Sequence, residues 1–216
     1  MASCPTQPPS EIIFGWLGLF AAWGFFLAPI GTMLQVRNHG SVEAFSFFPY
    51  IAGCISTLLW IVYATVTPCK LEPLVTNIGG FGLMMSYAVF FVAHAGQRQR
   101  TMLQQAGAGL VLVGAILLGG LVLAPRLSFT PPETDPPQSK QTFIIGLFTD
   151  AFAVVLFASP LSVLGQVVRT QSVEYMPLGL TLGVGACTSC WLVYGARRPA
   201  CFMCTSHAEP TYVCCV

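Results

Sequence analysis

One stretch of this chain is written twice, and this repeat limits the folds that the chain can adopt. The first copy begins LAPIGTMLQVRNHGSVEAF and ends ISTLLWIVYA, whereas the second begins FASPLSVLGQVVRTQSVEYMP and ends ACTSCWLVYG. The same offset of 131 residues separates Pro29 from Pro160 and Trp60 from Trp191. It also separates the matching glutamines, Ser-Val-Glu triplets and tyrosines of the two copies. So many matches at one offset, rare residues included, indicate an internal duplication.

Composition places this duplication in a membrane. Hydrophobic residues make up 55% of the 216 residues and charged residues only 8%, against about 25% charged residues in a typical soluble domain. Six windows with few or no charges can each supply the roughly 20 apolar residues that a membrane-spanning helix needs. They lie between Glu11 and Arg37, Glu43 and Lys70, Pro73 and Ala93, Arg100 and Arg126, Phe143 and Val168, and Glu174 and Arg197. The sequence therefore predicts an all-α integral membrane protein surrounded by the lipid bilayer.

The windows divide the chain into two repeats and a linker. Residues 12–94 are predicted to form a first three-helix repeat, and residues 101–125 a transmembrane linker helix. Residues 126–142 are predicted to be an exposed loop, because Pro-Pro pairs beside acids are typical of irregular segments. Residues 143–196 form an incomplete second repeat, and the cysteine-rich residues 197–216 a divergent tail that is too polar to span. The expected pattern is three helices, one and three, with about six spans present and the seventh missing.

Charge and motifs argue against several classes of function. A net charge of +1 argues against a nucleic-acid partner. No paired acid and base, activated nucleophile or set of metal ligands stands out, so we expect neither an enzyme nor a cofactor. The tail sequence CFMCTSH has a C-x-x-C and a nearby His, but four zinc ligands at suitable spacing are not evident. We expect this tail to reflect an altered reading frame, a retained intron or an alternative end.

The repeated motifs resemble those of the SWEET sugar transporters, also called the MtN3/saliva family. They are the prolines of LAPI and ASPL, the loops RNHGSVEAFSFFPY and RTQSVEYMP, the endings WIVYA and WLVYG, and the third-helix sequence VTNIGGFGLMMSYAVFF. The resemblance covers about residues 12–195. It implies parallel repeats related by an axis along the membrane normal. It also implies a facilitative, bidirectional uniporter that moves mono- or disaccharides, glucose- or sucrose-like, by alternating access.

A sugar site needs amide or hydroxyl groups for the sugar's edges and aromatic rings for its C–H faces. Asn77 lies in an apolar helix, where a helix–helix hydrogen bond and a sugar contact are equal alternatives. The resemblance favours the sugar contact. Trp60 and Trp191 are either interfacial anchors or, as the resemblance implies, the paired walls of a pocket. One helical turn earlier, Ser56 and Cys187 should face the same side as these tryptophans.

The resemblance implies further pocket, hinge and gate positions. Four residues match pocket positions by their spacing before the repeated prolines, with ordinary helix packing as the alternative: Ala22, Phe25, Ala153 and Leu156. Four prolines resemble a family tetrad of helix hinges, with helix termini as the alternative: Pro29, Pro49, Pro160 and Pro177. Tyr63 and Tyr194 resemble outer-gate positions.

Two other functions stay open at this point. In the family, the missing helix carries a second Asn, so the chain is alternatively a truncated, non-transporting subunit that associates with full-length relatives and modulates them. A member of the wider PQ-loop group that carries amino acids or serves as a receptor is a third alternative, which the repeated W-x-x-Y and SVE motifs disfavour. Homo- or hetero-oligomers with relatives are the expected assemblies. The plasma membrane is the expected location, with an internal membrane as the alternative.

Overall fold

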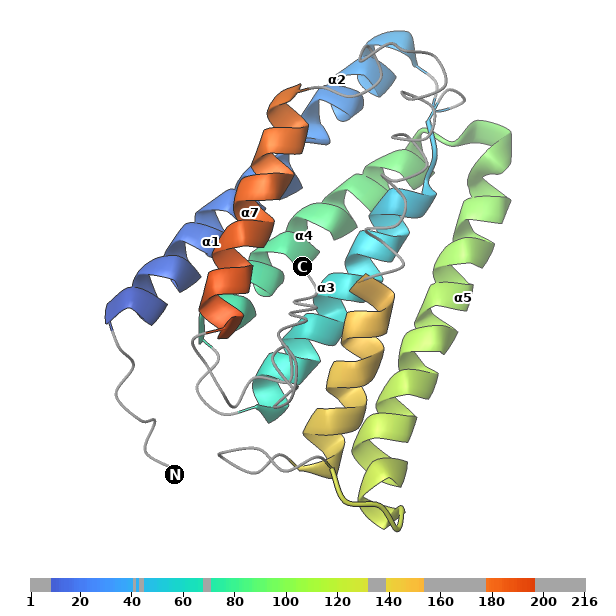
Figure 1. Cartoon of the computed structure of the whole chain (residues 1–216). Coiled ribbons are helices and arrows are strands. Elements are labelled where there is room, and N and C mark those ends of the chain that lie inside the picture. The colour runs from blue at the N-terminus through green and yellow to red at the C-terminus, as the bar shows by residue number, and fades with distance from the viewer. Residues whose placement is uncertain are drawn as a thin grey trace, which may run out of the picture.

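A computed structural model describes most of the 216-residue chain. The described residues are 9–40, 42, 45–67, 71–131, 139–153 and 178–196, with backbone only at 10, 11, 178–184 and 196. Every regular element within these ranges is a helix, and the long helices pack into one bundle (Figure 1). Three of the predicted site residues lie outside the described residues, as does the predicted tail 197–216: Leu156, Pro160 and Pro177.

The first predicted span is a bent helix. α1, Pro9–Leu27, is followed after a two-residue turn by α2, Ile30–His39. Pro29 lies in this turn with φ −65° and ψ −11°, and it has no amide hydrogen to bond back to Phe25. The whole segment Ile12–His39 is apolar and 28 residues long, so the two helices form one kinked candidate span.

The second and third predicted spans are present as α3, Phe48–Val66, and α4, Leu71–Ala93. These two helices are antiparallel, because Gly53 near the start of α3 packs against Met84 near the end of α4. At the next level, the rings of Tyr50 and Tyr87 meet edge to face with their centroids 6.1 Å apart.

α4 also packs along α1, and these two helices run in the same direction. Glu72 lies beside Gly15, and farther along both helices Gly79 meets the indole of Trp23. α4 therefore contacts both other helices of the first copy (Figure 1). The first and third helices of a three-helix repeat must be parallel, and this pairing shows that they are.

The predicted linker helix is continuous with short irregular turns at its ends. A 3₁₀ turn leads into α5, and a π-helical turn and a second 3₁₀ turn follow it: Gly96–Arg98, Gln99–Leu117, Leu118–Leu123 and Ala124–Arg126. The π-helical turn contains Gly120, whose missing side chain leaves space for Ile145. Gln141 also donates a hydrogen bond from Nε2 to Leu121 O at 2.9 Å. The linker is thus joined to the first helix of the second copy.

The two copies pack crosswise. The second copy contributes helical residues 140–153 and α7, Leu178–Ala196. α7 packs against α1. The helix 140–153 packs against α3 and the linker, because Thr142 Oγ1 lies 3.4 Å from Val66 O and Phe152 joins an apolar cluster that includes Leu59. The first helix of each copy therefore contacts the second helix of the other.

The directions of these contacts show that the copies are parallel. Thr142 lies beside the last residue of α3, Val66, and ten residues later Phe152 packs against the apolar cluster that includes Leu59 from the middle of α3. The helix 140–153 is therefore antiparallel to α3, as α1 is. Both first helices point the same way across the bundle, which is the arrangement of parallel repeats about an axis along the membrane normal.

Four of the six predicted spans are long and apolar enough to cross a membrane by length and composition: Ile12–His39, Phe48–Val66, Leu71–Ala93 and Gly96–Arg126. The predicted fifth span, 143–168, is described only as far as residue 153 and begins as a helix at 140, and the sixth is the 19-residue α7. Large apolar side chains face outward on these helices, for example Leu110 and Val111 at 71% and 74% exposure. Lipid is the solvent that suits such a surface.

Candidate functional site

The repeated tryptophan and tyrosine make the same contact in both copies. In α3, the rings of Trp60 and Tyr63 meet at 88° with centroids 5.6 Å apart, and in α7 the rings of Trp191 and Tyr194 meet at 83° and 5.4 Å. Both are edge-to-face pairs, the geometry that the aromatic quadrupole favours. Both tryptophans are half-buried and both tyrosines are buried. The duplication is therefore visible in side-chain geometry as well as in sequence.

In the second copy, this face of α7 lies on small residues of α1. A Cβ on Gly18 would come within 3.0 Å of the indole of Trp191, so the absence of a side chain allows the ring to approach the α1 backbone. Cys187, one turn before Trp191, is buried, and its Sγ lies 4.0 Å from Gly18 O. Cys187 thus faces the same side as Trp191, as predicted, and that side is the contact with α1.

Tyr194 reaches beyond α1 to α4. Its hydroxyl donates a hydrogen bond to Glu72 Oε2 at 3.2 Å, and both residues are buried. A Cβ on Gly15 would lie 2.9 Å from the Tyr194 ring and 3.0 Å from Glu72 Cγ. Gly15 therefore provides the space in which the tyrosine and the carboxylate meet. This bond joins the third helix of the first copy to the second helix of the second copy.

Asn77 is half-buried on α4 and is engaged within its own helix. Its Nδ2 donates a hydrogen bond to Pro73 O at 2.9 Å, and its Oδ1 accepts no hydrogen bond from the described residues. The helix–helix hydrogen bond that was one alternative for this residue is not formed among the described residues. The amide oxygen is an acceptor that suits a hydroxyl donor. A sugar contact at Asn77 stays a prediction.

The remaining predicted pocket residues differ in their exposure. Ala22 and Ala153, equivalent in the two copies, are 7% and 2% exposed, which fits helix packing in both copies. Phe25 is 40% exposed and contacts Phe26 edge to face at 6.0 Å. Ser56 is half-buried on α3, one turn before Trp60. Their roles around a sugar stay predictions.

The two described prolines of the tetrad have different structural roles. Pro29 lies in the turn that separates α1 from α2, which is a kink inside an apolar span. Pro49 lies in the first turn of α3, where a proline begins a helix without losing a hydrogen bond. Within the described residues, a kink is therefore present at Pro29, whereas Pro49 lies at a helix terminus, and a hinge role for either proline stays a prediction.

Glu72 is the residue that sequence reasoning missed. The predicted third span began at Pro73, so this acid was placed outside the helix, whereas the structure places it in the first turn of α4 at 5% exposure. An acid beside the start of an apolar helix is a signal, because a helix N-terminus attracts negative charge and a buried carboxylate needs a partner. The sequence does not show which partner, since Tyr194 is 122 residues away.

No group of three or more His, Cys, Asp or Glu side chains that could hold a metal ion gathers among the described residues. The described site is instead aromatic, amide and hydroxyl in character.

Two parallel, crosswise-packed helical repeats define a multi-pass membrane protein. A family model described as a sugar efflux transporter for intercellular exchange, MtN3_slv, matches residues 12–99 and 143–207. The chain belongs to this MtN3/saliva, or SWEET, family, which confirms the resemblance seen in its motifs.

Curated relatives agree with this assignment. The chain is 33% identical over 185 residues to the bidirectional sugar transporter SWEET7 of Arabidopsis thaliana, covering 84% of this chain and 68% of the relative. It is 29% identical over 194 residues to the bidirectional sugar transporter SWEET11 of Oryza sativa subsp. japonica, covering 87% and 58%. The chain thus spans less than two thirds of the length of SWEET11, and the same holds for SWEET13 of that rice, at 62%.

A protein of known structure has a similar fold. A structure of a eukaryotic SWEET transporter matches with a TM-score of 0.75 at 23% identity, covering 87% of this chain and 84% of that chain. The predicted fold class, an all-α membrane protein, is confirmed by this match and by the helices of the bundle.

Proposed function

We propose that this chain is a facilitative, bidirectional sugar uniporter that moves mono- or disaccharides by alternating access. The observation that carries the proposal is the matched pair of Trp–Tyr contacts, one on the second helix of each copy. A transporter built from repeats places its substrate between them, near the middle of the bilayer. The relatives named above are bidirectional sugar transporters, so a transport step rather than a catalytic step is proposed.

The described groups suit a sugar. Indole faces bind the weakly polar C–H faces of a sugar ring, and the half-buried Trp60 and Trp191 supply them from the two copies. Asn77 supplies an amide whose Oδ1 accepts no bond from the described protein groups and whose Nδ2 bonds only within its own helix. A sugar hydroxyl that binds this amide therefore does not have to break a contact between helices. The sugar hydroxyl competes only with the Asn77 bond inside α4, and such local competition favours binding that is easily reversed.

The bond between Tyr194 and Glu72 supports a closed gate. It ties α7 of the second copy to α4 of the first copy at one end of the bundle. Alternating access requires the copies to separate at one end while they close at the other. We propose that the Tyr194–Glu72 bond is broken each time this end opens and re-formed each time it closes.

Sugar uptake tests this function directly. We would measure uptake of radiolabelled glucose and sucrose by transport-deficient cells that express the whole chain, Asn77→Ala or Ser86→Ala. Ser86 is a matched control because it is exposed on the same helix and its hydroxyl donates to Gly82 O, one turn away. Surface biotinylation measures expression of each variant and the amount at the plasma membrane, which is the proposed location.

Three outcomes decide the proposal. Uptake by the parent and by Ser86→Ala, lost in Asn77→Ala at equal surface expression, supports the transporter and the role of Asn77. No uptake by a well-expressed parent contradicts stand-alone transport. If co-expression with a full-length relative then changes the uptake by that relative, the chain is a modulating subunit instead.

A further inference from the structure

The kink at Pro29 leaves backbone carbonyls without their helical partners, and Phe26 O is one of them. In a continuous helix, Phe26 O would accept a hydrogen bond from Ile30 N, but this bond is not formed in the described stretch around the turn. Ala28 N bonds instead to Phe25 O at 3.2 Å, and Met33 N bonds to Pro29 O at 3.0 Å where α2 begins. A backbone carbonyl without a partner is costly in lipid, so another donor is needed here.

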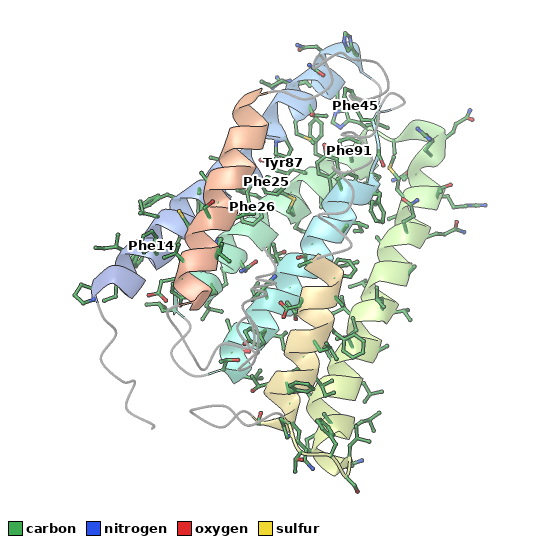
Figure 2. All side chains as sticks on the ribbon, viewed as in Figure 1. Phe14, Phe25, Phe26, Phe45, Tyr87 and Phe91 are labelled. Atoms are coloured by element: carbon green, nitrogen blue, oxygen red, sulfur yellow. The ribbon has the colours of Figure 1, made fainter. Side chains whose placement is uncertain are left out.

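Tyr87 of α4 supplies this donor. Its hydroxyl donates a hydrogen bond to Phe26 O at 3.1 Å, across 61 residues of sequence (Figure 2). The side chain of Tyr87 is 7% exposed, and its ring meets that of Tyr50 edge to face at 6.1 Å. The hydroxyl is therefore held in place from α3 as well as from its own helix.

The same residue of α1 is held a second time by α4. The ring of Phe26 occupies the space that a side chain at position 80 would fill, because Gly80 has none. Gly80 and Tyr87 are seven residues apart, so they lie on the same face of α4. α4 thus contacts Phe26 through its ring and through its carbonyl, on the N-terminal side of the kink.

We propose that Tyr87 is the positioning residue of the Pro29 hinge: its hydroxyl takes the place of the Ile30 amide at Phe26 O and thereby holds the bend between α1 and α2. This inference rests on the proposed transport function, because a hinge matters to function only if the helices rock between two arrangements. While the bond is present, α2 keeps its angle to α4. When the bond is released, α2 is free to move about Pro29 relative to the rest of the first copy.

The residues of this proposed hinge control lie in the first copy. The residue that matches Phe26 at the offset of 131 is Phe157, and the one that matches Tyr50 is Thr181, so the aromatic support of Tyr87 is not repeated in the sequence of the second copy. The two copies therefore differ in sequence at these positions, even though their Trp–Tyr pairs are alike. We expect substitution of Tyr87 to affect the bend between α1 and α2 without an equivalent effect on α7.

Hydrogen exchange tests this inference without depending on transport. The full chain in detergent or nanodiscs would be compared with Tyr87→Phe, which removes only the hydroxyl, and with Ser86→Ala as the control. We expect amides in a peptide spanning residues 26–36 to exchange roughly fivefold faster in Tyr87→Phe. This is roughly the change in the opening equilibrium that follows from losing the net stabilisation of one neutral hydrogen bond. Peptides from α5 and α7 should exchange at the parent rate in both variants.

A second variant distinguishes hinge control from general loosening. Pro29→Ala restores an amide at position 29 and allows a continuous helix, in which Ile30 N can reach Phe26 O. Tyr87→Phe should then have little further effect on exchange in the Pro29→Ala background. Equal acceleration in both backgrounds, no acceleration at all, or acceleration across the whole protein would overturn the inference.

Uptake measurements separate this inference from the proposed function. If the parent transports sugar, Tyr87→Phe should change the maximal rate at least threefold and leave the half-saturating sugar concentration nearly unchanged, because the hinge does not touch the substrate. A parent that does not transport sugar refutes the proposed function, and the exchange data still decide whether Tyr87 holds the bend. Altered exchange together with unaltered transport would refute the role of the bend in transport.

Discussion

Replacing Tyr194 by phenylalanine removes a single hydroxyl from the contact between α7 and α4. That hydroxyl donates to Glu72 Oε2 at 3.2 Å, and the Glu72 carboxylate has no other hydrogen-bond or ion-pair partner among the described residues. A hydrogen bond to a charged group contributes about 1.5–3 kcal/mol, and removal of one partner leaves the other buried and unsatisfied. We expect Tyr194→Phe to lower the free energy of unfolding by about 2 kcal/mol. For a chain of this size that corresponds to a Tm lower by about 4–8 °C.

Thermal melts of the purified chain in detergent, followed by size-exclusion chromatography with fluorescence detection, measure this shift. Ser189→Ala is the matched control, because Ser189 lies on the exposed side of the same helix and bonds to Gly185 O, one turn away. Glu72→Gln keeps an acceptor and removes the charge, so its Tm should fall less than that of Tyr194→Phe.

The double variant decides whether the two residues act together. If the bond is real, the double variant Tyr194→Phe, Glu72→Gln should lower the free energy of unfolding little more than Tyr194→Phe alone. The stability losses of two residues in direct contact are not additive. A Tm for Tyr194→Phe within 1 °C of the parent, where we expect several degrees, would refute the reasoning. Additive losses in the double variant would refute it too.

Two further predictions test the crosswise packing and the aromatic pairs. Gly120→Ala should destabilise the fold by about 1–3 kcal/mol in thermal melts, because its Cβ would lie 2.5 Å from Ile145. The control is Gly114→Ala on the same linker, whose Cβ would meet no atom within 4 Å and which should be neutral or stabilising. Equal effects of these two changes would contradict the packing of the linker on the helix 140–153. Trp60→Ala and Trp191→Ala should each reduce sugar uptake at least tenfold at equal surface expression, and loss in only one of them would contradict a site shared by both copies.

Much of the fold could be predicted from the internal repeat and from the lengths of the apolar segments. The offset of 131 residues predicted equivalent roles for Trp60 and Trp191, and their ring contacts with the following tyrosines are nearly the same. The kink at Pro29 was also predictable, because proline removes a hydrogen bond wherever it lies inside a long apolar segment. These features depend on residues that are close in sequence or matched by the duplication.

The contacts between distant residues could not be predicted in the same way. Tyr87 meets Phe26 across 61 residues and Tyr194 meets Glu72 across 122. A tyrosine in an apolar helix shows that its hydroxyl needs a partner, but not which carbonyl or carboxylate lies opposite once the helices have packed. Glycines such as Gly15 allow these helices to approach closely. A glycine has no side chain, so its chemistry in the sequence gives no sign of which residue packs against it.

The Tyr87–Phe26 and Tyr194–Glu72 bonds both involve α4, and this gives the third helix of the first copy a particular place in the proposed mechanism. At its first turn, Glu72 binds Tyr194 of the second copy, and four turns later Tyr87 binds the kinked first helix. α4 runs parallel to α1 between these two points, with Gly79 and Gly80 seated on the aromatic rings of Trp23 and Phe26. We expect a helix held so closely along its length to move as a unit with the segment before Pro29. Opening the end at Glu72 therefore needs α7 to move away from α1 and α4 together, whereas α2 is the part of the first span that is left to bend at the opposite end.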